Sequence, residues 1–395
     1  MAFSQINSLQ HNLAWQEVAT DADLEDLIDE AIACGAYAID TEFHTEKTYF
    51  PKLALVQIAY GAKSAIVDPF SVDISLMARL LASDAKAIFH AGDQDLKILY
   101  DVCHLLPKSV FDTQLAAGFL GFSTPSLSLV IDKMLNVVLD KGSQLTDWTK
   151  RPLGAEQKLY AINDVRYLIH LHDMMESQLV SLGRLDWHRE ECQRLLLKSR
   201  QPQDPKEAWW KIKQFRQLKG IHRGIAQEAA AWRETRAREM NLPLRYILSD
   251  LALAAIANRP PHSIEDLAGV RDMDLAKTDL KSLFASIERG KVLPESELVF
   301  PQAGYVEDRM LKPILGLSLV YVAEKARQLF IDQAILATRT DLALFYKDPS
   351  SGLIRNSWRF DLIGEPLLKL FKGEASLAFG KDGSVVLEQR SYDAI

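Results

Sequence analysis

Cysteine is scarce in this chain, and its three cysteines, Cys34, Cys103 and Cys192, lie far apart. They form no Cys-x-x-Cys pair, so the sequence lacks both the framework of a disulfide-rich secreted protein and a cysteine-based zinc site. The first residues, MAFSQINSLQHNLAW, contain no basic stretch followed by an apolar one, so no secretory signal is expected. We therefore interpret the cysteines as free thiols and expect a cytoplasmic protein.

Long hydrophobic runs are also missing. The longest apolar stretches, such as LALAAIA, fall well short of the ~18–20 residues that a membrane-spanning helix needs, so no membrane partner is expected. There is no excess of basic residues either, because the formal net charge is −7. Taken alone, this charge argues against a nucleic-acid partner, since phosphate contacts require Lys and Arg.

The charge is unevenly distributed, however. Residues 206–223 carry six basic side chains and one acidic side chain, whereas residues 21–30 carry six acids and no base. Two interpretations of the basic segment stay open. It is either a surface that guides nucleic acid or the solvated face of a helical bundle whose core contains Trp209, Trp210 and Phe215.

What the chain does have is enough apolar material for two or three folded domains, with 395 residues of which 48% are hydrophobic. Strands are predicted at 36–43, 53–60, 64–68 and 86–90, the first three as an antiparallel meander, and helices at 94–106 and 155–183. Alternation of strands and helices predicts parallel βα units. From about 205 the chain is mostly helical, with linker-like stretches at 200–209 and 289–306 and a strand-like end at 384–390. A weak likeness between LPLRYILSDLAL and FIDQAILATRTDLALF indicates an internal repeat.

The predicted strand at 36–43 contains the stretch YAIDTEF (37–43), which carries two carboxylates. Because side chains alternate along a strand, Asp40 and Glu42 point to the same side and repel each other. A bound cation would offset this repulsion, and Mg²⁺ and Mn²⁺ prefer carboxylate oxygens. Sites for two such ions need three or four carboxylates from distant points of the chain.

Further acids stand at suitable positions. Asp95 opens the helix that follows a predicted strand, and Tyr160 and Asp164 are four residues apart on one helical face. Taken singly, each has an ordinary explanation: Asp40 could cap a loop, Asp95 could be a helix N-terminal acid, and Tyr160 and Asp164 could be an exposed pair. Only their ordered combination favours a shared site.

That combination resembles a known family. The stretches DTEF…TYFPKLALVQIA, HAGDQDL and DWTKRPLGAEQKLYAINDV resemble the three exonuclease motifs of the DEDD superfamily, in its tyrosine subgroup, and specifically the ribonuclease D family. Residues 208–290 resemble the HRDC domain, and the last 90 residues resemble a second, divergent one. The resemblance implies an α/β ribonuclease H-like exonuclease domain, a mixed sheet with flanking helices, at 1–200. Two all-α HRDC-like helical bundles would follow, at 206–292 and 305–395.

The resemblance also implies a metal-dependent 3′–5′ exoribonuclease that uses two divalent ions, Mg²⁺ or Mn²⁺. Its substrate would be RNA with a single-stranded 3′ end, such as tRNA precursors, and it would release nucleoside 5′-monophosphates. No obligate protein partner is evident. Carried over residue by residue, the metal-binding carboxylates are Asp40, Glu42, Asp95 and Asp164, and Tyr160 positions the attacking water.

Substrate contacts are predicted for Thr41, Phe43, Gln57 and His90. Phe43 could stack on the terminal base, although it should face away from Glu42 if the strand continues. Buried structural roles for Gln57 and His90 stay open. The second motif also contains Asp93, which we interpret as a solvated neighbour of Asp95.

Two alternatives to this function stay open. The first keeps the chemistry but takes DNA as substrate, because the choice depends on recognition of a 2′-hydroxyl, which no residue here reports. The second is a catalytically inactive nucleic-acid-binding adaptor built from the same domains. The intact acids at all four positions argue against the adaptor.

Overall fold

The structure is a computed structural model that describes residues 15–139, 146–300 and 311–391. The described residues divide into two compact units. The first lies within residues 1–42, 53–200 and 307–395, and the second within residues 43–52 and 201–306. The last helical region of the chain therefore groups with the N-terminal sheet rather than with the bundle that precedes it in sequence.

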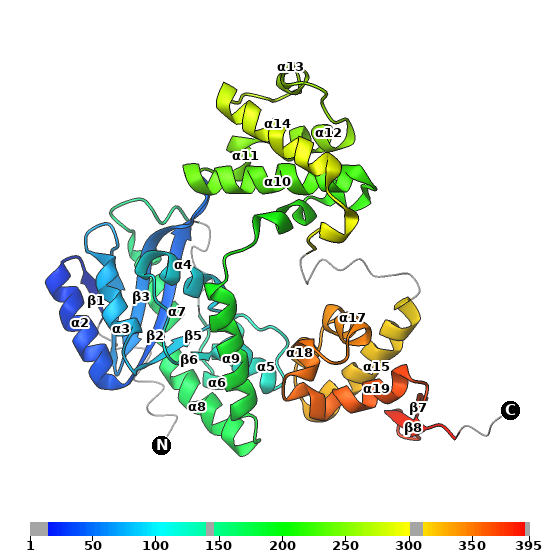
Figure 1. Cartoon of the computed structure of the whole chain (residues 1–395). Helices are drawn as coiled ribbons and strands as arrows, with labels where there is room; N and C mark the ends of the chain where they lie inside the picture. The colour runs from blue at the N-terminus through cyan, green and yellow to red at the C-terminus, as the bar shows by residue number, and fades with distance from the viewer. Residues whose placement is uncertain (1–14, 140–145, 301–310, 392–395) are drawn as a thin grey trace. The chain divides into compact units, whose positions relative to one another are not determined.

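The sheet of the first unit has six strands in the order β1-β4-β3-β2-β5-β6 (Figure 1). The strands are β1 (Trp15–Val18), β2 (Ala36–His44), β3 (Lys52–Tyr60), β4 (Lys63–Val67), β5 (Lys86–Phe89) and β6 (Val110–Asp112). β3 and β4 are antiparallel, while β1 pairs with β4, β2 with β5 and β5 with β6 in parallel. The expected mixed sheet is thus confirmed. The sequence missed β1 and β6, which have only four and three residues.

Helices flank this sheet (Figure 1). They are α2 (Asp21–Cys34), η1 (Ile74–Leu76), α3 (Met77–Leu81), α4 (Asp93–Cys103), α5 (Thr113–Phe119), α6 (Leu127–Leu135), α7 (Ala155–Val165), α8 (Leu168–Ser181) and α9 (Leu185–Arg200). The single helix predicted at 155–183 is two helices, α7 and α8, that separate at residues 166–167. β3 is buried at every residue from Leu53 to Tyr60, so the centre of the core lies along this strand.

The C-terminal bundle of the first unit packs against α5 and α9. It contains α15 (Lys312–Leu329), α16 (Gln333–Leu336), α17 (Arg339–Lys347), α18 (Gly352–Arg355), a π-helical turn η7 (Phe360–Gly364), α19 (Glu365–Phe371) and a hairpin of β7 (Ala375–Phe379) and β8 (Val385–Gln389). Arg359, buried to 2% exposure, donates to Glu191 of α9 at 2.6 Å, and the rings of Trp187 and Trp358 stack with their centroids 4.7 Å apart. The guanidinium of Arg184 donates to the carbonyl oxygens of Phe119 and Leu329. These contacts join the C-terminal bundle to the helices that flank the sheet, within the first unit.

The second unit is a helical bundle. Its elements are η2 (Pro205–Lys211), η3 (Lys213–Gln217), α10 (Ile221–Met240), α11 (Leu244–Ile247), α12 (Asp250–Asn258), α13 (Ile264–Ala268), α14 (Lys277–Val292) and η4 (Glu295–Glu297). The start of the region predicted to be mostly helical consists of two 3₁₀-helices, η2 and η3, which are separated by an extended Ile212. Trp209, Trp210 and Phe215 are buried in the core with α10, as the structural interpretation of these aromatics predicted, and the basic residues around them are mostly exposed.

The predicted linker at 289–306 is wrong over its described part. Residues 289–292 belong to α14, and the chain then returns to the bundle core. The Trp209 indole donates to the carbonyl oxygen of Val299 at 2.8 Å, and the rings of Trp209 and Trp210 both contact Phe300. The rest of the predicted linker, 301–306, lies outside the described residues.

The predicted internal repeat is confirmed in the local geometry of the two bundles. A long helix, a four-residue helix and a nine-residue helix follow one another in both, as α10–α11–α12 and as α15–α16–α17. Leu248 and Ala337 are extended at the same point of the two series. The next residues, Ser249 and Thr338, cap α12 and α17 through their hydroxyls.

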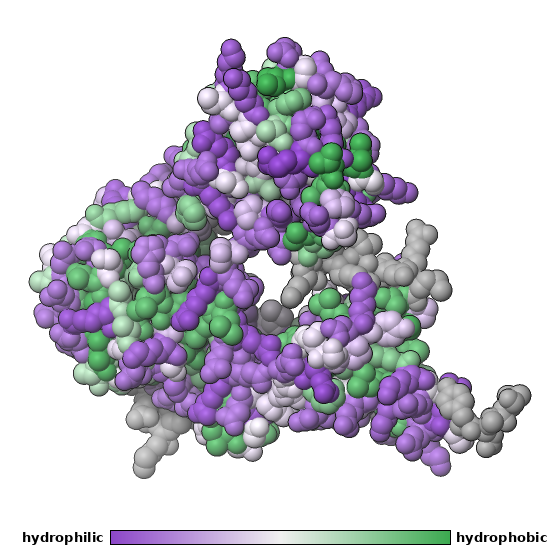
Figure 2. All heavy atoms as spheres, in the orientation of Figure 1, coloured by the Kyte–Doolittle hydropathy of each residue, from purple (hydrophilic) through white to green (hydrophobic). Residues whose placement is uncertain are grey.

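Figure 2 shows hydrophilic and hydrophobic residues interspersed on the face in view, which is the ordinary surface of a globular protein. Among the described residues, no helix combines the length and the hydrophobicity needed to cross a membrane.

Candidate active site

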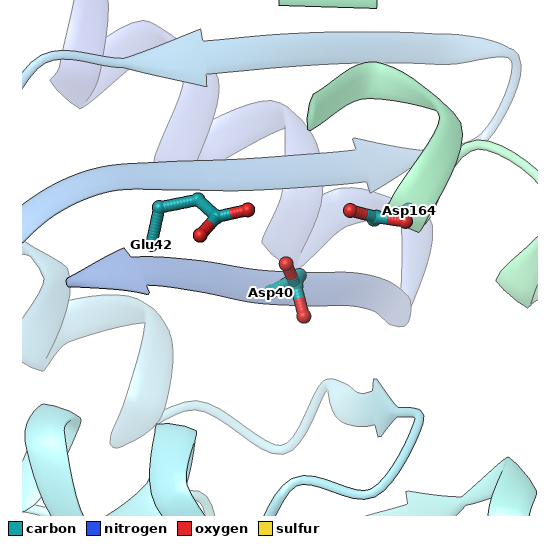
Figure 3. Close-up of side chains that lie close together, drawn as sticks. All are labelled: Asp40, Glu42 and Asp164. Carbon is teal, nitrogen blue, oxygen red and sulfur yellow. The ribbon is translucent and has the colours of Figure 1, made fainter. Parts of the chain in front are cut away.

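Three carboxylates converge beside the centre of the sheet (Figure 3). Asp40 and Glu42 project from β2, and Asp164 projects from α7. One oxygen from each lies within 4.8 Å of the others. The strand alternation therefore places the first two on one side, as predicted, and α7 brings the third to them.

Local contacts of α7 place Tyr160 and Asp164. Ala161 and Ile162 on its neighbouring face pack against the sheet residues Ala54, Leu55 and Ile66 and against Trp148. The ring of Tyr160 contacts that of Trp148, with centroids 6.0 Å apart. A hydrogen bond from Tyr160 to Asp164 acts on the carboxyl and favours its ionised form.

The loop before α7 is anchored by Arg151, which the sequence analysis did not single out. Its guanidinium donates to both carboxylate oxygens of Asp68, at 2.7 and 2.8 Å, and to the carbonyl oxygen of Ala54 at 2.7 Å. A bidentate pair of this kind fixes geometry as well as charge. Arg151 lies in the third exonuclease motif, in the stretch RPL. The only sign in the sequence that it has a structural role is its position in a loop directly before a proline.

Asp95 lies in the first turn of α4 and is buried to 8% exposure. Its Oδ1 accepts hydrogen bonds from the backbone N–H of Thr41 at 3.0 Å and from the Thr41 hydroxyl at 2.5 Å. Because Thr41 stands between Asp40 and Glu42 on β2, these bonds tie α4 to the strand that carries the acid pair. Asp95 is not one of the three acids within 4.8 Å, but its charge acts on all three of them.

Burial and the charges of neighbouring acids raise the pKa of the three converging carboxyl groups, Asp40, Glu42 and Asp164. For Asp40, burial raises the pKa well above its usual range, and the charges of Asp95, Asp164 and Glu42 add to the effect. Burial, together with the same kind of repulsion, raises the pKa of Glu42 to about 8 and that of Asp164 to about 7. Hard oxygen donors that repel one another fit a divalent cation such as Mg²⁺ or Mn²⁺, which would relieve the repulsion.

This electrostatic strain predicts how pH and metal affect stability. Folded pKa values of about 8 for Glu42 and about 7 for Asp164 lie above the ~4 of unfolded carboxyl groups. Their contribution to the free energy of unfolding is therefore complete below pH ~4 and is lost as the pH rises through 7 to 8. A bound cation opposes this loss, so adding Mg²⁺ should raise Tm by more at pH 8 than at pH 6 in a thermal melt. Equal increases at both pH values would contradict the assignment.

The residues predicted to contact substrate differ in their burial and in their hydrogen-bond partners. Thr41 is buried and its hydroxyl is bonded to Asp95. His90 has partners at both ring nitrogens, the Thr113 hydroxyl at 2.9 Å and the Pro125 carbonyl oxygen at 3.2 Å. Gln57 is fully buried, and among the described residues neither its Oε1 nor its Nε2 has a hydrogen-bond partner.

Phe43 and Tyr49 belong to the second unit. β2 continues to His44, so Phe43 stands within the strand and alternation turns it away from the side of Glu42. The Tyr49 hydroxyl bonds to the carboxylate of Glu234 and accepts a bond from Nε of Arg238 at 2.7 Å. Tyr49 is thus held by α10.

Asp93 is a partly exposed neighbour of Asp95, with 36% of its side chain accessible, and it also forms two ion pairs that the sequence did not indicate. Its carboxylate pairs with Lys97 at 3.0 Å and with Lys198 at 3.1 Å, and these bonds hold its pKa below the usual range against the opposing effect of burial. Asp93 therefore links the start of α4 to the end of α9. It is not among the acids that converge in Figure 3.

Comparison with known proteins agrees with this geometry. A family model described as 3′-5′ exonuclease matches residues 15–180, and one described as HRDC domain matches residues 222–281. Ribonuclease D of Jannaschia sp. (strain CCS1) is 33% identical over 86% of this chain and 91% of its own. Ribonuclease D of Sphingobium indicum is 34% identical over 86% of this chain and 90% of its own.

Solved structures agree as well. The chain is similar to Escherichia coli RNase D, described as an exoribonuclease involved in structured RNA processing, with a TM-score of 0.78 and 26% identity over 91% of this chain and 99% of that one. The catalytic core of RRP6 from Trypanosoma brucei shares the fold, with a TM-score of 0.56 and 24% identity over 71% of this chain and 80% of that one. With its carboxylates in place, the chain belongs to the ribonuclease D family and is a 3′–5′ exoribonuclease.

Proposed function

We propose that the enzyme holds two divalent ions, Mg²⁺ or Mn²⁺, among Asp40, Glu42, Asp95 and Asp164. It would use them to remove nucleoside 5′-monophosphates one at a time from the 3′ ends of structured RNA such as tRNA precursors. The observation that carries the proposal is the convergence of three carboxylates with raised pKa values, a costly arrangement without cations.

In this reaction, water attacks the phosphorus of the last phosphodiester. The bond from phosphorus to the 3′-oxygen breaks, and that oxygen takes up a proton and becomes the new RNA end. When bound, the ions lower the pKa of the attacking water and neutralise charge on the transferring phosphate. The Tyr160 hydroxyl, which bonds to Asp164, would orient the water, because a phenol is a better hydrogen-bond partner than a base near neutral pH.

For the substrate end, we propose Gln57 as a contact that forms only if substrate binding opens its buried position. A buried amide with no hydrogen-bond partner is costly, so a ligand that satisfies it gains binding energy. Phe43 remains a proposed stacking residue for the terminal base. We propose that Thr41 and His90 affect substrate binding indirectly. Thr41 would act through Asp95 and His90 through Thr113, their respective hydrogen-bond partners.

We propose the exonuclease domain at 1–200, an HRDC domain at 206–292 and a second, divergent HRDC-like domain at 305–395. The exposed basic residues of 206–223 support a role for the HRDC domain in guiding the RNA backbone. We place the reaction in the cytoplasm, which the three unpaired cysteine thiols support. We propose no obligate protein partner.

The test uses two 5′-labelled strands of identical sequence, one RNA and one DNA, each with a stem and a single-stranded 3′ tail. We expect a ladder that shortens from the 3′ end of the RNA with Mg²⁺ or Mn²⁺, is absent with EDTA and is much slower on DNA. Thin-layer chromatography should identify the product as nucleoside 5′-monophosphate. A ladder that persists in EDTA, or nucleoside 3′-monophosphate as product, would refute the proposed chemistry.

A further inference from the structure

Asp112 is a buried carboxylate, 1% exposed, at the end of β6. Its Oδ1 accepts hydrogen bonds from the N–H groups of Gln114 at 2.8 Å and Leu115 at 3.0 Å, which caps α5. The same oxygen accepts from Ala91 N–H at 3.3 Å, and Oδ2 accepts from Gly92 N–H at 2.9 Å. A helix cap needs only the first two bonds. The other two tie Asp112 to the connection between β5 and α4.

That connection is tight. Phe89 at the end of β5 is paired with Asp112 in the sheet, and Ala91 follows with φ +60°, a left-handed conformation unusual for alanine. Gly92 is the N-cap of α4 and has no side chain to cap it. A Cβ at position 92 would lie 2.8 Å from the Phe89 side chain. The two N–H groups bonded to Asp112 therefore belong to a turn with little room to move.

This turn decides where Asp95 lies, because Asp95 stands in the first turn of α4, three residues after Gly92. From the opposite side, Asp95 is held by the N–H and hydroxyl of Thr41 on β2. We infer that Asp112 is a positioning residue of the metal site: it fixes the β5–α4 turn and so holds Asp95 beside Asp40, Glu42 and Asp164. The inference rests on the proposed function, since it takes Asp95 as a metal ligand.

The chemistry of the four bonds calls for a carboxylate. An ionised aspartate only accepts hydrogen bonds, and it can do so through both oxygens; here Oδ1 accepts three of the four bonds and Oδ2 accepts the fourth. Asparagine has nearly the same volume, but one of its oxygens is replaced by an NH₂ group. In Asp112→Asn that group would face an N–H donor of either the α5 cap or the turn at Gly92. The variant thus disturbs the turn without creating a cavity.

The experiment titrates the full-length protein with Mn²⁺ by calorimetry in the absence of RNA. Asp112→Asn should bind Mn²⁺ about tenfold or more weakly, as is typical when a residue that orients a ligand is lost. Ser126→Ala is the matched control, because it removes the hydroxyl that accepts from Leu129 N–H and caps α6 elsewhere in the same domain. It should leave Mn²⁺ affinity within twofold of the wild type.

If circular dichroism shows that Asp112→Asn is unfolded, Gly92→Ala provides a second test of the inference. Its added Cβ displaces the same turn while Asp112 stays intact. It should also weaken Mn²⁺ binding about tenfold. Wild-type affinity in folded Asp112→Asn, or an equal loss in Ser126→Ala, would overturn the inference alone. A wild-type protein that binds no Mn²⁺ would overturn the proposed function and the inference together.

Discussion

Asp40→Asn is expected to reduce the rate of RNA hydrolysis by about 10³-fold or more and to raise the stability of the metal-free protein. The rate falls because an oxygen ligand at the centre of the acid set is replaced by a neutral amide that holds cations poorly. Stability rises because burial and the charges of Asp95, Asp164 and Glu42 penalise an ionised Asp40, and the amide removes that penalty. Single-turnover rates and thermal melts in EDTA at pH 8 measure the two effects.

Asp93→Asn is the matched control for this variant. Asp93 is an aspartate in the same motif as Asp95, but it pairs with Lys97 and Lys198. The substitution removes two partly exposed ion pairs, each of which contributes little, and should keep the rate within about twofold. If Asp93→Asn lost as much activity as Asp40→Asn, or if Asp40→Asn kept its activity, the carboxylate assignment would be wrong.

Tyr160→Phe is expected to lower kcat by about 10²-fold and to leave Mn²⁺ affinity within about twofold. Phenylalanine retains the ring that packs on Trp148, so α7 should keep its place. Only the hydroxyl that bonds to Asp164 is lost. Calorimetric titration with Mn²⁺ and single-turnover rates at saturating RNA separate the two quantities.

Two further variants serve as a negative and a positive control for Tyr160→Phe. Tyr167→Phe removes another buried tyrosine hydroxyl in the same domain, one that accepts from Arg166, and should leave the rate nearly unchanged. Asp164→Asn should lose both metal affinity and rate. The orienting role of Tyr160 is disproved if Tyr160→Phe loses Mn²⁺ as severely as Asp164→Asn does.

The periodicity of side chains along a strand and along a helix made the positions of the acid pair and of the Tyr160–Asp164 pair predictable. Alternation along a strand is enough to place Asp40 and Glu42 together, and the helical repeat is enough to place Tyr160 and Asp164 on one face. Both rules act over a few residues and depend little on the rest of the fold. Their outcome in the structure is the convergence seen in Figure 3.

Contacts between distant segments were not predictable in this way. Thr41 and Asp95 are 54 positions apart, and a threonine in a strand gives no sign that its hydroxyl will bond to an acid on a helix. Arg359 and Glu191, 168 positions apart, join the C-terminal bundle to α9 by the same kind of bond. Such pairs depend on how whole elements pack, which no local pattern records.

Tertiary packing also overrode local preference. Residues 206–217 have helical spacing, yet burial of Trp209, Trp210 and Phe215 against α10 is achieved by two 3₁₀-helices joined through an extended Ile212. Intrinsic helix propensity is a weak preference. The burial of large aromatic side chains contributes more to stability and can override it. The strands β1 and β6 were missed for the complementary reason, because four and three residues are too few to show a period.

Anomalous diffraction from crystals grown with Mn²⁺ would show whether Asp40, Glu42, Asp95 and Asp164 hold the ions on which hydrolysis depends. We expect two anomalous peaks, about 3.5–4 Å apart, surrounded by these four side chains. Crystals of Asp40→Asn should lose at least one peak. If Mn²⁺ were bound only elsewhere on the protein, in crystals that cleave RNA when dissolved, the four carboxylates would not be the site of the catalytic ions.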